Sequence, residues 1–197
     1  YDDETPENFF SSHKLKQVLR YGENPHQEAN FYINSGSEGA GITSAEQIQG
    51  KELSYNNIAD TDAAIECVSN FEKPSCVIVK HANPCGVASG KTLLEAYEKA
   101  FSCDETSAFG GIIALNKTLD KFTAKKIIDN QFVEVIAAPA INPAAKKIIA
   151  RKKNVRLLLV KDLFQKPIGF KTLTMNQGIL VQNVDDGAVS KKDLKVV

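Results

Sequence analysis

The sequence predicts a layered α/β fold in which a mostly parallel sheet lies between helices. Four short apolar runs are rich in β-branched residues, which is typical of strands buried on both faces. Helical segments alternate with these runs, and the connections between the runs are too long for hairpins. The chain has 197 residues, 43% of them hydrophobic, which is enough to bury one such core. The four predicted strands are Cys76 to Val79, Ile112 to Leu115, Phe132 to Ala137 and Val155 to Val160.

The amino-terminal segment is predicted to be an arm followed by a short helix. Residues 1–13 are acidic and polar and suggest a linker. A helix is predicted over 14–19, because its apolar residues are spaced like one face of a helix. These residues are Leu15, Val18 and Leu19. A structured turn is expected over 20–27, where Gly22 and Pro25 occur, and a short strand over 29–33.

Four further helices are predicted from polar residues that precede apolar faces. The expected first residues or caps are Asp60, Thr92, Thr123 and Asn142, the last followed by Pro143. The amides of Asn56 and Asn57 come just before the first of these helices, where they can bond a ligand or form a turn. A basic group is interpreted as a solvated face near a helix end, and it consists of Lys146, Lys147, Arg151, Lys152 and Lys153. Two extended segments around Asn176-Gln177-Gly178 predict an antiparallel hairpin or an edge strand pair.

Composition restricts the class of protein. Lys plus Arg and Asp plus Glu both number 24, so no net charge would attract nucleic acid or an anionic membrane. No apolar run approaches the roughly 18 residues that span a bilayer. The four cysteines suit a reduced, cytoplasmic protein, because a chain of this size needs no disulfides. The chain starts without Met and stops in an apparent strand at Lys195-Val196-Val197, so we expect a piece of a longer protein.

The most reactive stretch is expected at the end of the strand that begins at Ser75. Lys80 and His81 follow its apolar run, and Asn83-Pro84 with Gly86 predicts that the strand breaks there. Ligands of open α/β sheets bind at the carboxyl ends of strands. A lysine ammonium can stabilise a forming oxyanion, and an imidazole can move a proton during acyl transfer. Because neighbours on a strand face opposite ways, one site can use both only if the strand bends. A solvated Lys-His pair on the surface is the alternative.

Two other chemistries compete with acyl transfer as interpretations of the same stretch. Zinc deaminases combine His-x-Glu with Pro-Cys-x-x-Cys, whereas Pro84-Cys85 is followed here by Gly86, Val87 and Ala88. His81 and Cys85 alone are too few ligands for zinc, so no metal is expected. Cys85 could act as a nucleophile with His81 as its base, although a buried structural thiol is the commoner arrangement.

Four motifs resemble one family. They are Leu19-Arg20-Tyr21-Gly22-Glu23-Asn24-Pro25-His26-Gln27, Leu53-Ser54-Tyr55-Asn56-Asn57-Ile58-Ala59-Asp60, Val79-Lys80-His81-Ala82-Asn83-Pro84-Cys85-Gly86 and Ser107-Ala108-Phe109-Gly110-Gly111. In this order they closely resemble the bifunctional purine biosynthesis proteins, which join an IMP cyclohydrolase domain to an AICAR transformylase domain. The resemblance covers essentially the whole chain. It implies that residues 1–18 are an arm from a preceding domain and that 19–197 are the first half of the transformylase domain.

The resemblance also implies a fold and a reaction. The fold would be a layered α/β fold similar to cytidine deaminase, without its zinc. The reaction would transfer a formyl group from 10-formyltetrahydrofolate, a cosubstrate rather than a tightly bound cofactor, to AICAR, the aminoimidazole carboxamide ribotide. The product would be FAICAR, in purine biosynthesis. The full-length parent would be a cytoplasmic homodimer with no nucleic-acid or membrane partner.

By the same resemblance, motif positions carry site roles. His81 would transfer the proton and Lys80 would stabilise the formyl oxyanion. Arg20 and Tyr21 would hold the nucleotide, while Asn57, Phe109, Gly110 and, by a weaker match, Glu134 would contact substrate. Supporting residues would be Asn24, His26, Asn83 and Ser107. Since other contacts in the family come from the second half, two hypotheses remain. The chain is either a half-site competent only in the full-length dimer, or a non-catalytic fragment that binds the nucleotide weakly.

Overall fold

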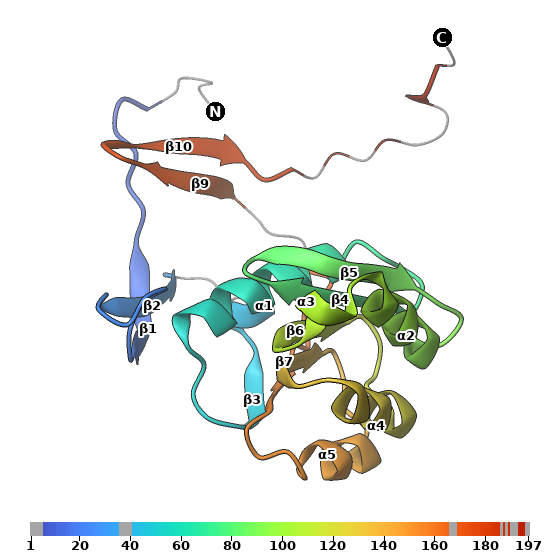
Figure 1. Cartoon of the computed structure of the whole chain (residues 1–197). Coiled ribbons are helices and arrows are strands. Elements are labelled where there is room, and N and C mark those ends of the chain that lie inside the picture. The colour runs from blue at the N-terminus through green and yellow to red at the C-terminus, as the bar shows by residue number, and fades with distance from the viewer. Residues whose placement is uncertain are drawn as a thin grey trace. The chain divides into compact units, whose positions relative to one another are not determined.

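The main sheet of the computed structural model has six strands in the order β3-β8-β7-β6-β4-β5 (Figure 1). β6, β7 and β8 are parallel neighbours, while β4 is antiparallel to both β5 and β6, and β3 is antiparallel to β8. β5 to β8 therefore run in one direction and β3 and β4 in the other. The predicted layered α/β fold is confirmed. The strands are β3 (Glu46–Gln49), β4 (Ser75–Lys80), β5 (Asn83–Ser89), β6 (Gly111–Leu115), β7 (Val133–Ala138) and β8 (Arg156–Leu159).

The structure describes residues 6–35, 41–165, 169–185, 187, 189 and 193–195. The chain divides into two units, Tyr1–Leu163 and Phe164–Val197. The six-stranded sheet and all the predicted site residues belong to the first unit. The second unit contains an antiparallel hairpin of β9 (Phe170–Met175) and β10 (Gly178–Asn183), so the hairpin predicted around Asn176-Gln177-Gly178 is confirmed. Of the residues 195–197, where a further strand was expected to begin, 196 and 197 lie outside the described residues.

Helices cover both faces of the main sheet (Figure 1). On one face Ile78, Ile113 and Ile136 pack with residues of α2, α4 and α5. On the other face Val77, Ile112 and Val135 pack with α1 and the short helix η1. Alternate residues of β4 thus enter two different cores, which explains why its apolar run has no polar alternation. The helices are η1 (Gly41–Thr43), α1 (Tyr55–Val68), α2 (Leu93–Cys103), α3 (Glu105–Ala108), α4 (Lys121–Asn130) and α5 (Pro143–Ile149).

Helix caps account for where the helices begin. Thr92 caps α2, and Asn142 caps α5 with Pro143 as the first helical residue, both as predicted. α4 begins earlier than expected, because Asp120 accepts the backbone N–H groups of Phe122 and Thr123. The prediction that Asp60 caps α1 is wrong. Ser54 is the cap, and Ser54 and Asn57 form a reciprocal capping box, so Asn56 and Asn57 lie inside the helix.

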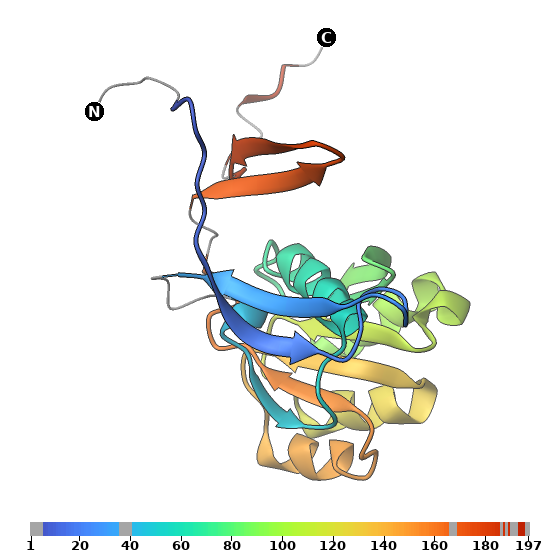
Figure 2. The same ribbon diagram turned by 90° about the vertical axis from the view of Figure 1, so that its left-hand side faces the viewer.

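The helix predicted over 14–19 is also wrong. This segment is strand β1 (His13–Leu19), which pairs antiparallel with β2 (Ala29–Asn34) as a separate two-stranded sheet (Figure 2). The predicted turn over 20–27 and the strand after it are confirmed. Leu15 and Val18 are exposed, whereas Leu19 is buried and Phe31 of β2 packs against the α1 core. Pairing with β2 thus overrides the helical spacing of three apolar residues.

The break predicted at Asn83-Pro84 is a reversal of the chain rather than an end of strand structure. β4 and β5 form a hairpin with only His81 and Ala82 between them. Pro84 pairs opposite Val79 next to an irregularity in the register. A proline is tolerated there because β5 is the edge strand, so the N–H that proline lacks is not needed for pairing with a neighbouring strand. No helix in the described part of the chain is long and apolar enough to cross a bilayer.

Candidate functional site

Lys80, His81, Phe109, Gly110 and Glu134 lie around one end of the central strands of the main sheet, although the carboxyl ends of the parallel strands lie at the other end. Arg20, Tyr21, Asn24 and His26 lie instead on the turn of the separate β1–β2 sheet. Because β4 is antiparallel to β6, Val79 lies opposite Ile112, and Gly111 pairs with Val133. The carboxyl end of β4 therefore lies beside the amino ends of β6 and β7. The rule that ligands bind at the carboxyl ends of parallel strands does not select this end of the sheet. The site is defined instead by the side chains that meet there.

Lys80 is the last residue of β4, and its ammonium is held in place. Nζ donates a hydrogen bond to the backbone carbonyl of Phe109 at 2.6 Å. A Cβ added to Gly110, which has φ of +71°, would lie 3.0 Å from this Nζ. The left-handed conformation and the close approach both favour glycine at this position. A lysine ammonium has three donors, so two remain for an oxygen of a ligand.

His81 leaves the strand and enters a strained turn. His81 and Ala82 have φ of 52° and 58°, which for a two-residue hairpin loop indicates a type I′ turn. Neither residue is glycine or asparagine, so each left-handed conformation costs roughly 1–2 kcal/mol. The strand thus ends between Lys80 and His81, which is the bend that a shared site requires. The Nδ2 of Asn83 donates to the His81 carbonyl at 2.7 Å.

Asp60 bridges this turn to α1. One carboxylate oxygen accepts the His81 N–H at 3.2 Å, and the other accepts the Ala82 N–H at 2.7 Å. The interpretation of Asp60 as a helix cap missed this contact. The sequence contains one signal that could have indicated it. Asp60 follows Asn57 by three residues, so both side chains lie on the same side of a helix.

Asn57 and Glu134 form the second polar contact between α1 and the sheet. Asn57 is 3% exposed, and its Nδ2 donates to Glu134 Oε2 at 2.8 Å. Arg156, the first residue of β8, places Nη1 3.9 Å from the same carboxylate oxygen. Its Nε donates to the Glu52 carbonyl at 3.2 Å. Arg156 was not predicted as a site residue from the sequence. The signal that could have identified it is that it is a single cation near the start of an apolar strand.

Replacing Asn57 by aspartate is expected to lower the free energy of unfolding by about 1–3 kcal/mol. The substitution removes the donor to Glu134 and places two carboxylates in contact at a buried position. Asn56→Asp is the matched control, because Asn56 is exposed and is also in the first turn of α1. Urea denaturation of both variants measures the difference. Equal stability of the two variants would contradict the importance of the Asn57–Glu134 contact.

Phe109 and Gly110 connect α3 to β6 and close the site beside Lys80. Gly110 N–H donates to the Phe132 carbonyl at 2.8 Å, and the rings of Phe109 and Phe132 lie 5.7 Å apart. Phe109 is 62% exposed, so its ring is available to a flat ligand. Ser107 is bonded through N–H and Oγ to Asp104, at 2.9 and 2.6 Å, and so stabilises the short helix before this loop.

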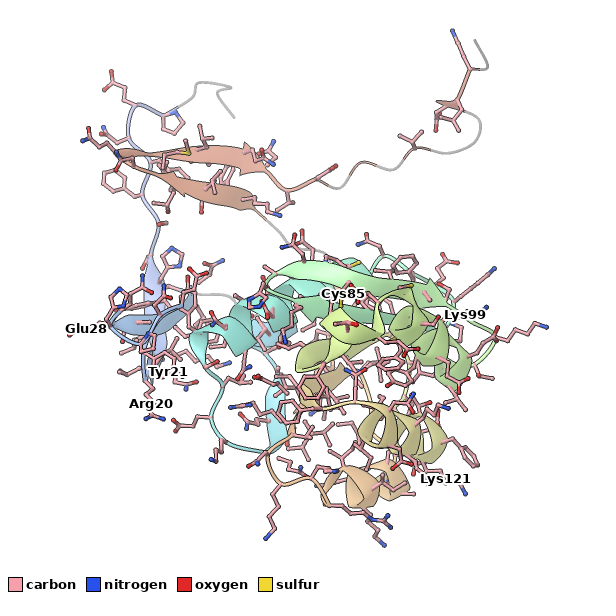
Figure 3. The ribbon with its side chains drawn as sticks, viewed as in Figure 1. Arg20, Tyr21, Glu28, Cys85, Lys99 and Lys121 are labelled. Atoms are coloured by element: carbon pink, nitrogen blue, oxygen red, sulfur yellow. The ribbon has the colours of Figure 1, made fainter. Side chains whose placement is uncertain are left out.

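Arg20, Tyr21, Asn24 and His26 lie on the turn between β1 and β2. The Arg20 guanidinium carbon is 5.8 Å from the centre of the Tyr21 ring, and Figure 3 shows both side chains near the end of β1. Asn24 N–H and Nδ2 donate to Gln27 Oε1 at 2.7 and 3.2 Å, which orders the turn. The turn meets α1 where Asn56 Nδ2 donates to the Glu23 carbonyl at 3.4 Å. Arg20 and His26 are exposed.

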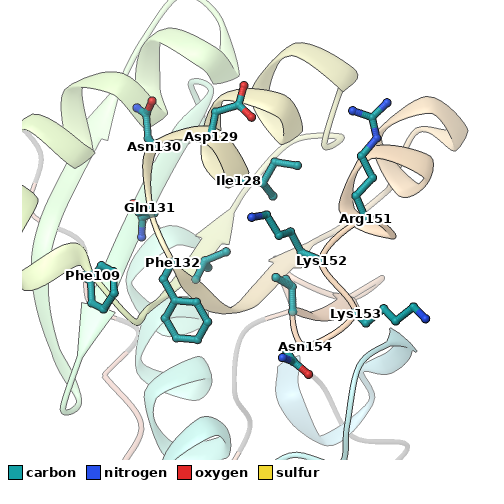
Figure 4. A pocket seen from close by; sticks show the side chains of 12 residues that line it. Phe109, Ile128, Asp129, Asn130, Gln131, Phe132, Arg151, Lys152, Lys153 and Asn154 are labelled. Carbon is teal, nitrogen blue, oxygen red and sulfur yellow. The ribbon is translucent and has the colours of Figure 1, made fainter.

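A pocket of about 580 Å³ adjoins Phe109. Figure 4 shows the Phe109 and Phe132 rings on one side and Lys152 pointing into the pocket from the other. Arg151, Lys153 and Asn154 also line it. The basic segment interpreted as a solvated face thus borders a pocket that shares Phe109 with the Lys80 site.

Cys85 has the environment of a structural thiol. Burial raises the pKa of Cys85, and Sγ donates to the Ile78 carbonyl at 3.5 Å. A raised thiol pKa disfavours the thiolate, so these contacts oppose a nucleophilic role. All four cysteines are unpaired. Among the described residues, no group of three or more His, Cys, Asp and Glu side chains is placed to hold a metal ion.

The site therefore combines a held ammonium, an exposed imidazole in a clamped turn, an amide-carboxylate pair and an exposed aromatic ring. These groups come from α1, the β4–β5 hairpin, the α3–β6 loop and β7. A protein-family model described as AICARFT/IMPCHase bienzyme matches residues 1–197.

Proposed function

The chain belongs to the AICARFT/IMPCHase bienzyme family, and from this premise we propose that it supplies catalytic groups for formyl transfer in purine biosynthesis. The donor is 10-formyltetrahydrofolate, the acceptor is AICAR, and the product is FAICAR. The observation that carries the proposal is the arrangement of Lys80 and His81. One is held by Phe109, and the other lies in a turn held by Asp60.

The proposed reaction requires one proton to move as one C–N bond replaces another. The 5-amino nitrogen of AICAR attacks the formyl carbon, and the carbonyl oxygen gains negative charge. The Lys80 ammonium stabilises this charge with the donors that Phe109 leaves unused. The bond from carbon to N10 of the folate then breaks. His81 takes a proton from the attacking amine and returns one to N10, so no other reactant is needed.

The remaining predicted residues would bind the nucleotide. Arg20 has an exposed guanidinium, which suits bidentate bonding to a phosphate, and Tyr21 lies against it. Phe109 offers a ring face to the base, and Gly110 allows close approach. Glu134 and Asn57 are already paired, so they would present their remaining oxygens and donors as a fixed unit.

We further propose that this chain forms only part of the complete site. In this proposal the second half of the transformylase domain supplies other phosphate and folate contacts, and the full-length enzyme is a cytoplasmic homodimer. Four unpaired cysteines suit a reducing compartment.

The test is a formyl-transfer assay with the 197-residue chain alone, with the remainder of the domain added, and with the full-length enzyme. We expect no turnover above background from the isolated chain, weak binding of AICAR to it by calorimetry, and turnover by the full-length enzyme. Turnover by the isolated chain would contradict the partial site. A full-length enzyme that does not formylate AICAR would overturn the proposed function itself.

A further inference from the structure

We propose that Asp60 is a positioning residue for His81, acting through the backbone of the β4–β5 turn. The proposal rests on the proposed function for its effect on catalysis. Its structural basis is independent, because each carboxylate oxygen of Asp60 accepts one N–H of two successive residues, at 3.2 Å from His81 and 2.7 Å from Ala82. Hydrogen bonds to an ionised acceptor are the stronger kind, so the clamp restrains two peptide groups at once.

The turn needs such a clamp because its sequence does not favour its conformation. Type I′ turns usually contain Asn-Gly or Gly-Gly, whereas here the two positions at positive φ are occupied by His81 and by Ala82, which stands where glycine is usual. Residues in such conformations persist only where their surroundings impose them. The His81 carbonyl is also restrained, by Asn83 Nδ2 at 2.7 Å. With both its N–H and its carbonyl bonded, the backbone of His81 is restrained on both sides, and so is the direction of its Cα–Cβ bond.

Asp60 can act as a fixed support because α1 is itself anchored near it. Asn57, three residues earlier on α1, donates to Glu134 of β7 at 2.8 Å, and the capping box with Ser54 holds the start of the helix. α1 therefore connects β7 to the His81 turn through two side chains. Lys80 is held separately, by Phe109. Loss of Asp60 would release His81 while leaving the Lys80 contact in place.

The kinetic test compares Asp60→Ala with Asp120→Ala in the full-length enzyme. Asp120 is a matched control, since its carboxylate also accepts two backbone N–H groups, at 2.8 and 3.0 Å, at the start of α4. We expect Asp60→Ala to lower kcat by about 10- to 100-fold, the usual result of misplacing a catalytic group, while KM for AICAR changes little. Asp120→Ala is expected to leave kcat unchanged. Equal kcat in the two variants would overturn the proposal.

A second variant separates positioning from a direct charge effect. Ala82→Gly removes the Cβ at positive φ, so the turn should form without a clamp. In the Asp60→Ala background, Ala82→Gly is expected to recover most of the lost kcat, because the loss arises from backbone geometry. Absence of recovery would show that Asp60 does not act through the turn.

A third readout does not depend on activity. Amide hydrogen exchange of the 197-residue chain should show the His81 and Ala82 N–H groups protected, with exchange at least about tenfold faster in Asp60→Ala and unchanged in Asp120→Ala. Unprotected amides in the unsubstituted chain would overturn the clamp. Protected amides in an enzyme that does not formylate AICAR would leave the clamp standing and refute only the proposed function.

Discussion

His81→Asn in the full-length enzyme is expected to lower kcat for formyl transfer by about 10²- to 10⁴-fold, the usual contribution of a general acid-base group. KM for AICAR should change little, because the residues proposed to bind the nucleotide lie on other segments. Asparagine is chosen because it tolerates positive φ better than alanine, so the turn at φ 52° is kept while the imidazole is removed. Steady-state kinetics with AICAR and 10-formyltetrahydrofolate measure both constants.

His13→Ala is the matched control for this experiment. His13 is exposed on β1, and its ring nitrogen lies 3.1 Å from the Ser11 hydroxyl oxygen. Its removal should leave kcat unchanged. If His81→Asn kept near-normal turnover, His81 would not be the proton-transfer group, whatever the state of the turn.

Lys80→Ala should likewise lower kcat, in that case through loss of oxyanion stabilisation.

Gly86→Ala is expected to destabilise the first unit by about 3 kcal/mol or more, at the upper end of overpacking effects. Gly86 is buried in β5, where α2 packs against the strand. A Cβ at this position would lie 2.0 Å from the Ala100 carbonyl oxygen and 2.9 Å from its carbon. These are backbone atoms, so no change of rotamer can relieve the clash. Urea denaturation followed by circular dichroism measures the loss, and a variant that fails to fold is the extreme form of the expected result.

Gly178→Ala is the control variant, because it adds a Cβ to a strand glycine without creating a clash. Apart from its neighbours in the chain, no heavy atom of the described residues lies within 4 Å of a Cβ built on Gly178, which is also a strand residue. We expect a stability change of no more than about 0.5 kcal/mol there. A Gly86→Ala protein that unfolds at the same urea concentration as the unsubstituted chain would show that α2 can move away from β5.

Local sequence signals were sufficient for much of the fold. The β4, β6, β7 and β8 strands were predicted because their residues are almost all apolar and many are β-branched. Thr92 and Asn142-Pro143 marked two helix starts correctly, because capping depends only on residues one to three positions away. The segment 14–19 was misassigned because its pairing with β2, which is distant in the sequence, makes it a strand. The start of α1 was misassigned although its signal is local, because Ser54 and Asn57 form a capping box and Asp60 bonds the His81 turn instead.

The sequence by itself determined the layered α/β class and singled out Lys80 and His81 as a reactive pair next to a forced turn. Its motifs also resembled the family to which the chain belongs. Only the tertiary structure decided that β4 runs antiparallel to β6, which brings Lys80 to the amino ends of the parallel strands. It also decided that Asp60 holds His81 and that Asn57 holds Glu134, 77 residues away. Such contacts depend on strand register and helix packing, which sum many weak interactions over the whole core and leave no local pattern in the sequence.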